Sequence, residues 1–415
     1  MRISVARRHV CRVLCGVLLQ LMGIVSWAAE WSIEPFVSLK GEYNDNILLT
    51  TAPHSSVWGI TLSPEVRVSG ESETLKVTGG LKLNLNRYFG EQGLDANDHF
   101  LTVHSRYRTE RDMLGLNLES TRDSTLASEL TTTGVVQARR QRSLFAINPS
   151  WSRSLTETTT ITAGYGYSAI DYPDTSGTSL IDYVNQTASV GLRSAFDERT
   201  VLVVAGYYEK FKTGPASFQA DTFGIEVGFE RDFSETLHGS FLLARRNSLS
   251  ESSSQALVCD GPILFGVCQG TITVLDSVKK ESSSAFTVSA ALDKRWETGT
   301  LSGRLSRDIS PSGLGSLIQT DRVQFAWTRQ WSPTLSGYLD ASVYRSRYIG
   351  GVVTQSNSRY YRVEPRLRWL LAQWWMLDAG YVYARQKYDN ASEAATANAV
   401  YVALTYTWPK VAISR

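Results

Sequence analysis

The chain has 415 residues, with 42 lysines and arginines against 40 aspartates and glutamates, and 11% of its residues are aromatic. A formal charge of +2 excludes nucleic-acid binding through bulk positive charge. Four of the basic residues precede Val13, so the rest of the chain has about two more acidic than basic groups.

Residues 1–28 predict a secretory signal peptide. An apolar run from Val13 to Val25 is too short for a transmembrane helix, which needs about 20 apolar residues. Ser26-Trp27-Ala28 then supplies small residues at the cleavage positions. The run is preceded by a basic region that contains Arg2, Arg7, Arg8 and Arg12. The mature chain is therefore expected to comprise residues 29–415 and to leave the cytoplasm.

The segment 29–415 reads as one long series of alternating strands. Between Trp58 and Val68, for example, Ile60 and Leu62 share one face whereas Thr61 and Ser63 share the other. Many segments run ten or more residues, which is long for a soluble sandwich but suits a tilted membrane crossing. With no second long apolar run, only a closed barrel satisfies every backbone amide in a bilayer. The pattern predicts an all-β fold, a transmembrane antiparallel up-and-down β-barrel.

Short turns recur between longer and more variable polar stretches, as in outer-membrane barrels. Eight short turns imply nine hairpins, hence about 18 strands with both termini in the periplasm. The last strand alternates up to Trp408, and Pro409–Arg415 is expected to be a periplasmic extension. The eight turns lie at 71–73, 109–112, 155–158, 197–200, 234–236, 296–299, 331–334 and 372–374.

Charged residues alternate with the apolar ones and are expected to face the lumen. They are tolerable there only if the interior is wet, and about 18 strands leave room for an aqueous channel. A basic lining would attract acidic groups of a solute, although the arginines could instead pair with glutamates and merely fill the lumen. The lumen candidates are Arg67, Lys76, Lys82, His104, Arg106, Arg108, Arg140, Arg142, Arg362, Glu364, Arg366 and Arg368.

Two cysteines remain after the signal peptide, which contains Cys11 and Cys15. Cys259 and Cys268 both lie in the longest irregular stretch, Ser250–Glu281, which the topology places outside the cell. An oxidising compartment and a small enclosed loop predict a disulfide between them. A metal site is not expected, because the two thiols have no nearby histidine or third cysteine.

No catalytic site or cofactor is expected. The chain lacks an HExxH helix, a nucleophile elbow and a phosphate loop. Asp98, His99 and His104 could suggest a hydrolase at the barrel rim, but histidines without a chemical role are the preferred interpretation. Asn44-Asp45-Asn46 could offer oxygens to calcium, but such a triplet usually makes a turn.

Three stretches resemble a known family. Leu39–Asn46, Thr121–Leu130, and Asn148–Ser152 followed by Leu155-Thr156-Glu157 are similar to segments of outer-membrane barrels encoded with exopolysaccharide synthesis and exosortase (PEP-CTERM) systems. The resemblance implies a porin-like barrel with a place in surface-polysaccharide export or assembly. It carries no catalytic residues to transfer.

These observations predict a barrel in the outer membrane of a Gram-negative bacterium that forms or assists a channel for exopolysaccharide export. Its expected partners are outer-membrane lipid, the polysaccharide and periplasmic export components. One alternative is a general or solute-selective porin for uptake of small molecules. A second alternative is a barrel-rim enzyme or a structural anchor.

Overall fold

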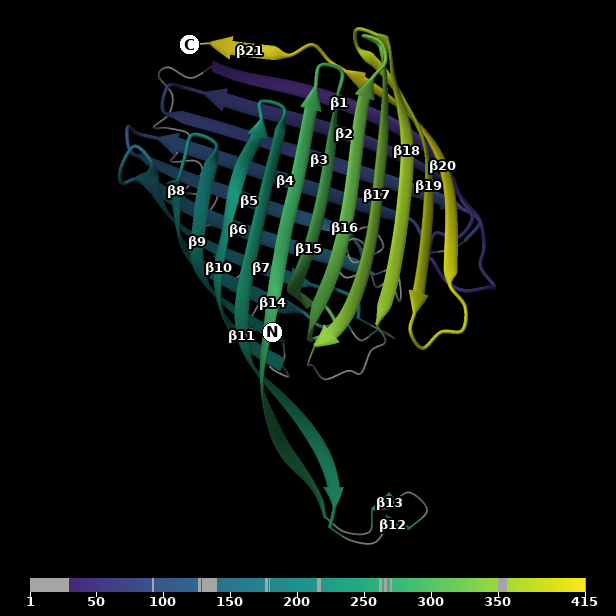
Figure 1. The fold of residues 1–415 in the computed structure, drawn as a ribbon. Helices are drawn as coiled ribbons and strands as arrows, with labels where there is room; N and C mark the ends of the chain where they lie inside the picture. The colour runs from purple at the N-terminus through teal and green to yellow at the C-terminus, as the bar shows by residue number, and fades with distance from the viewer. Residues whose placement is uncertain are drawn as a thin grey trace.

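The computed structural model describes residues 30–91, 93–125, 128, 140–175, 178, 180–214, 218–260, 263–264, 267–268, 271–349 and 357–414. The predicted signal peptide lies outside these residues and stays a prediction. The described part is an antiparallel β-barrel (Figure 1). Its first strands are β1 (Glu30–Asn44), β2 (Val57–Glu71), β3 (Leu75–Phe89), β4 (Ala96–Arg108), β5 (Asp112–Ser124), β6 (Gln141–Ser154), β7 (Thr159–Asp171), β8 (Tyr183–Ala195), β9 (Thr200–Thr213), β10 (Phe218–Ser234) and β11 (Leu237–Cys259).

The second half of the wall follows after a small hairpin of β12 (Ile263–Leu264) and β13 (Val267–Cys268). Leu39 of β1 is paired with Leu62 on one side and with Leu404 on the other, so the first and last strands of the wall close it. The predicted barrel of about 18 strands is confirmed for the described residues. Its remaining strands are β14 (Ile272–Trp296), β15 (Gly299–Ser312), β16 (Ser316–Gln330), β17 (Leu335–Ile349), β18 (Ser358–Ala372), β19 (Trp375–Tyr388) and β20 (Ala395–Thr407).

All eight predicted short turns connect consecutive strands at one end of the barrel, the upper end in Figure 1. Side chains within the turns form hydrogen bonds with the turn backbone. In the turn between β8 and β9, the backbone N–H of Arg199 donates to Asp197 Oδ1 at 2.7 Å, and this bond holds the pKa of that carboxyl below its ordinary value. By the rule that outer-membrane barrels keep their short turns in the periplasm, the opposite end faces outside.

The chain after Trp408 is built differently from the expected extension. Residues Val411–Ser414 form β21, which pairs with Glu30–Ile33 at the start of β1. Pro409 separates β21 from β20 because it has no backbone N–H to donate to the ladder. The tail therefore continues the barrel wall beside β1.

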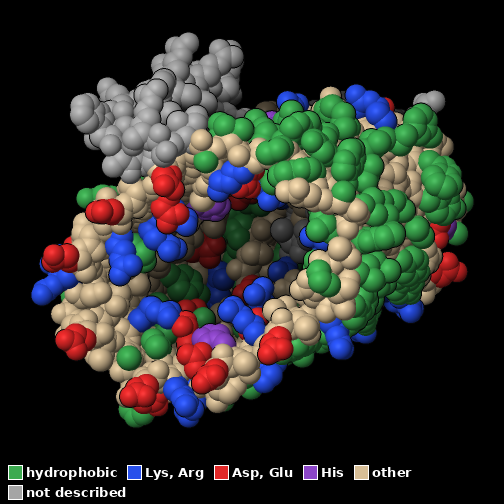
Figure 2. All heavy atoms as spheres, turned by 90° about the horizontal axis from the view of Figure 1, so that it is seen from above, with side chains coloured by type: hydrophobic (Ala, Val, Ile, Leu, Met, Phe, Trp, Pro, Cys, Tyr) green, Lys and Arg blue, Asp and Glu red, His purple; other side chains and the backbone are tan. Residues whose placement is uncertain are grey.

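The outer wall is apolar, as the alternation predicts. Leu39, Trp58 and Val400 are each more than half exposed, at 53%, 63% and 53%. Figure 2 shows hydrophobic side chains gathered on the outer wall and charged ones around the hollow within. An exposed apolar belt on a closed barrel is stable only against lipid, so the protein is a membrane-spanning barrel. Among the described residues, no helix is long and apolar enough to cross a membrane.

The expected irregular stretch Ser250–Glu281 was the main error in the predicted strands. Strands β11 and β14 have 23 and 25 residues and stay paired from Leu237 with Lys294 to Cys259 with Ile272. Because β10 pairs with β11 only as far as Ser252, the two strands leave the barrel as a ribbon of roughly 20 Å at 3.3 Å per residue. Figure 1 shows this ribbon below the loop end, with β12 and β13 at its tip.

Cys259 at the end of β11 is disulfide-bonded. The side chain of Cys268 lies outside the described ones, so its pairing with Cys259 stays a prediction. We expect the mature protein to take up no maleimide under denaturing conditions until it is reduced, and then to take up label on both cysteines. Labelling without reductant would contradict the disulfide.

Candidate functional site in the lumen

The strand register places eleven of the twelve lumen candidates at inner-face positions, opposite the exposed apolar residues. Lys76 lies beside Arg106, and Thr78 beside His104, on the neighbouring strands β3 and β4. Arg140 precedes β6, where its guanidinium lies 3.7 Å from Asp174 of the β7–β8 connection. The eleven are Arg67, Lys76, Lys82, His104, Arg106, Arg108, Arg142, Arg362, Glu364, Arg366 and Arg368.

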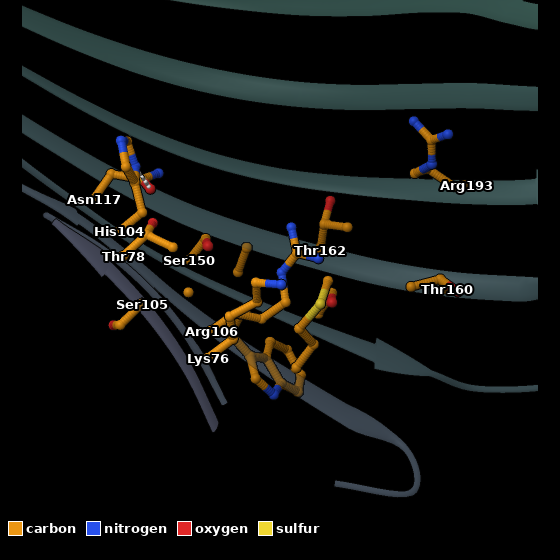
Figure 3. Close-up of a pocket in the computed structure, with 15 residues that line it drawn as sticks. Lys76, Thr78, His104, Ser105, Arg106, Asn117, Ser150, Thr160, Thr162 and Arg193 are labelled. Atoms are coloured by element: carbon orange, nitrogen blue, oxygen red, sulfur yellow. Dashed lines mark hydrogen bonds between the residues drawn. The ribbon is translucent and has the colours of Figure 1, made fainter. Parts of the chain in front are cut away.

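A cavity of about 620 Å³ lies against the inner face of β3 and β4, here called the β3–β4 wall, which contributes Lys76 and Arg106 to its lining (Figure 3). At the edge of the cavity, His104 Nδ1 donates a hydrogen bond of 2.8 Å to Asn117 Oδ1. A second cavity of about 300 Å³ shares Thr78 and His104 with it. The polar lining of the larger cavity comes from β3 to β8 and contains Lys76, Thr78, His104, Arg106, Asn117, Ser150, Thr160, Thr162 and Arg193.

Some inner-face cations of β2 to β4 form ion pairs with a carboxylate, and others do not. Arg67 Nε lies 2.6 Å from Glu65, and Lys76 Nζ lies 2.9 Å from Glu71. Within the described residues, the side chains of Lys82, Arg106 and Arg108 form no ion pair or hydrogen bond; those of Arg106 and Arg108 are exposed to the lumen. These three groups remain available to a solute.

The arginines of β18 are engaged. Arg362 contacts Glu364 at 2.6 Å, and Glu364 also accepts a 2.8 Å hydrogen bond from the Tyr401 hydroxyl. Arg368 Nε donates to Asp378 at 2.9 Å. Arg366 lies over the ring of Tyr338, with 4.5 Å between guanidinium carbon and ring centre. The arginines of β18 therefore match the alternative that arginines pair with other side chains and fill the lumen. The cations of β3 and β4 match it less well.

Carboxylates gather on the other side of the barrel. Glu226 of β10, Asp308 of β15 and Asp340 of β17 occupy inner-face register positions and have no ion pair within the described part of the chain. Arg304 of β15 lies on the same inner face and has no ion pair among the described residues, so this side of the lumen carries charges of both signs.

The tip of the β15–β16 hairpin folds into the outer mouth. Ile309 and Leu317 occupy outward positions of the alternation, yet they are only 9% and 4% exposed. They pack against Phe211 and Phe218 from β9 and β10. The carbonyl of Gly313 accepts a 2.7 Å hydrogen bond from the Ile181 N–H, which ties the tip to the β7–β8 connection. The hairpin therefore narrows the channel at its outer end.

Strands β14 and β15 separate where this tip turns inward. Their pairing stops at Val288 with Arg307, although both strands continue. Arg246 of β11 replaces the missing partner, because its Nη1 donates to the Ile309 carbonyl at 2.7 Å. Its Nη2 lies 3.3 Å from Glu209, in an ion pair whose side chains are 5% and 13% exposed. Arg246 thus fastens the tip from inside the barrel.

The β1–β2 connection also enters the mouth. Leu49, with a positive φ of 50°, packs against Tyr344 and Tyr360 in a buried cluster. Asp45 Oδ1 accepts a 2.7 Å hydrogen bond from the backbone N–H of Asn398 on β20, and Asn46 donates 2.9 Å to the Thr396 carbonyl. The triplet Asn44-Asp45-Asn46 therefore anchors a loop, and no group of metal-ligating side chains forms among the described residues.

The histidines considered for a rim hydrolase are not brought together. His99 lies at an outer-face position of β4, whereas Asp98 and His104 lie at inner-face positions. Asp98 accepts a 2.9 Å hydrogen bond from Asn86 Nδ2. Asp98 and His104 are about 20 Å apart along the strand at 3.3 Å per residue.

Several residues that shape the lumen were not among the sequence candidates. Lys40 and Tyr401 meet across the closing seam, where the ammonium lies 4.9 Å from the ring centre. Arg246 and Arg322 lie at inner-face positions like the predicted arginines. Strand parity alone could have found these four. It could not have found Ile309, whose inward position comes from the bend of its hairpin.

The closed barrel, its apolar outer wall and its charged, water-accessible interior define a porin-like barrel of the Gram-negative outer membrane. No protein-family model matches this chain, and no curated protein is significantly similar to it.

Among solved structures, OccAB2 of Acinetobacter baumannii is similar with a TM-score of 0.45 and 11% identity, over 91% of this chain and 98% of that one. The ferric-catecholate import receptor Fiu of E. coli K12, in its open form, is similar with a TM-score of 0.47 and 10% identity, over 92% and 82%. OccK2 (OpdF) of Pseudomonas aeruginosa, in complex with glucuronate, gives 0.43 and 12%, over 91% and 97%. The class assigned above rests on the strand pairing and outer wall of this chain.

Proposed function

We propose that this barrel is a porin through which small hydrophilic solutes diffuse, with a preference for those that carry a carboxylate or phosphate. The observation that carries the proposal is the set of unpaired cations on the inner face of β3 and β4, Lys82, Arg106 and Arg108, of which Arg106 lines the cavity of about 620 Å³. A cationic side chain without a partner in a wet lumen is free to attract a passing anion. No chemical step is required.

The narrowed outer mouth sets an upper size for the solute. The β15–β16 tip and the β1–β2 connection both enter the mouth, and each contributes buried apolar side chains, Leu317 and Leu49. Because this packing fixes both segments in the outer mouth, the opening that remains suits small solutes better than a polymer chain.

Exopolysaccharide export, the function expected from the sequence resemblance, is the second candidate. Aromatic side chains on the inner face favour it, because sugar rings stack on aromatic faces. Cations already cover four of these faces: Arg366 over Tyr338, Lys40 over Tyr401, Arg322 over Tyr344 and Arg67 over Phe36. A conduit for a polymer would need both mouth segments to move aside, so we favour the small-solute porin.

Size-dependent uptake by proteoliposomes tests the proposal. We expect liposomes containing the refolded mature protein to swell quickly in gluconate or glucose, more slowly in disaccharides and not in larger oligosaccharides. Protein-free liposomes and liposomes with the heat-denatured protein are the controls. Equal swelling in all sugars, or no swelling with a folded sample, would contradict the proposal.

A further inference from the structure

The outer wall carries a row of cations at the loop end of β15, β17, β18 and β19. Arg345 of β17 is paired with Arg359 of β18, and Arg359 with Lys387 of β19, so their backbones are direct neighbours. Arg307 of β15 stands opposite Asp321 of β16, which stands opposite Arg345. The row, here called the outer basic row, consists of Arg307, Arg345, Arg347, Arg359, Arg385 and Lys387.

This row faces the membrane side of the wall and not the lumen. Leu305, Val323 and Val343 occupy the same face two residues further down their strands and are 48%, 52% and 42% exposed. Tyr361 continues this apolar line below Arg359 and is 41% exposed. The cations therefore begin where the apolar belt ends, about 7 Å away along each strand.

The positive charge of the row is only partly neutralised. Within the described strands β15 to β19, Asp321 is the one outward carboxylate at the loop end. It binds Arg307 at 2.5 Å and Arg347 at 3.3 Å. Asp389 follows β19, two residues beyond Lys387, and accepts a 3.3 Å hydrogen bond from Asn357 Nδ2. Arg345, Arg359, Arg385 and Lys387 are exposed and have no ion pair within the described part of the chain.

Elsewhere on the same rim, outward cations such as Arg87, Lys210 and Arg122 each have a partner on a neighbouring segment. Arg87 lies 3.9 Å from Asp95, Lys210 lies 3.7 Å from Asp221, and Arg122 donates to the side chain of Gln141. Lys212 stands two residues beyond Lys210 on β9. The density of cations over β17 to β19 is therefore a local feature of the wall.

We propose that the outer basic row binds the phosphate groups of a glycolipid in the outer leaflet, the phosphorylated disaccharide of lipid A. Guanidinium groups match phosphate oxygens in charge and in bidentate geometry. The adjoining apolar line takes the acyl chains of the same molecule. One lipid is thus held at both its charged and its apolar part, and this site is independent of the lumen.

Native mass spectrometry of the detergent-solubilised mature protein tests the site, with bis-phosphorylated lipid A as the probe. We expect lipid A to stay bound to the wild-type protein and its dephosphorylated form to bind at least about tenfold more weakly. We expect the triple variant Arg345→Gln, Arg359→Gln, Arg385→Gln to lose roughly tenfold or more in apparent affinity.

A matched variant controls for the loss of three positive charges from the outer rim. Arg87→Gln, Arg122→Gln, Lys212→Gln removes the same charge from outward positions of β3, β5 and β9, and we expect it to bind lipid A like the wild type. Heat-dependent migration in gels verifies that both variants are folded. Equal binding by the two triple variants, or equal binding of phosphorylated and dephosphorylated lipid, would overturn the proposal.

Discussion

Replacing Arg246 with alanine is expected to loosen the β15–β16 tip, with a lower free energy of unfolding and a larger single-channel conductance. The guanidinium bonds both the Ile309 carbonyl and Glu209, and almost none of it is exposed. Its loss leaves a nearly buried carboxylate without its cation, which costs about 3 kcal/mol in comparable buried pairs. The substitution also removes the hydrogen bond to the Ile309 carbonyl, on the edge of β15 that β14 does not pair beyond Arg307.

Urea unfolding and planar-bilayer recordings measure the two effects. Arg193→Ala is the matched control for the unfolding measurement, because Arg193 forms a bidentate pair with Glu230 but its side chain is 40% exposed. A pair that is this exposed to water contributes less than about 1 kcal/mol. If Arg246→Ala unfolded like Arg193→Ala and conducted like the wild type, Arg246 would not hold the tip in place.

Reversing the charge of Lys82 and Arg106 together is expected to change the ion selectivity of the channel from anions to cations. Both side chains lie at inner-face positions without an ion pair, whereas the carboxylates of the opposite side, such as Asp340, would remain. With two further acidic groups in the lumen, the field along the β3–β4 wall changes sign. We expect the chloride-to-potassium permeability ratio to fall by roughly tenfold.

The reversal potential in a potassium chloride gradient gives this ratio directly. Arg87→Glu, Arg122→Glu changes the net charge by the same amount on the outer face of β3 and β5, and its selectivity is expected to stay that of the wild type. An unchanged reversal potential in Lys82→Glu, Arg106→Glu would place the conducting path elsewhere in the lumen.

The strands and turns were predictable because the wall of a membrane barrel repeats a simple rule. Each crossing must present apolar side chains to lipid at every second position, so Ile60 and Leu62 reveal their face even in isolation. The eight short turns followed from the same regularity. Strand parity also placed Arg366 and Arg368 at inner-face positions.

The predictions that were wrong concern segments outside the lipid-facing wall of the barrel. Ser250–Cys259 pairs with Ile272–Glu281, and this ribbon extends beyond the barrel wall, so no lipid-facing position imposes apolar alternation on its sequence. Ile309 and Leu317 have the parity of lipid-facing residues, and only their contacts with Phe211 show that the hairpin bends inward. Such a bend depends on residues distant in sequence, among them Arg246.

Single-channel recording of the refolded wild-type mature protein in a planar bilayer tests the central claim most directly. The account predicts discrete conductance steps with an anion-selective reversal potential, which gluconate reduces and which oligosaccharides of the host's own surface polymer leave unchanged. Silence in a folded sample, or steps that the host's oligosaccharides block while gluconate has no effect, would contradict it and favour a conduit for polysaccharide or a closed barrel.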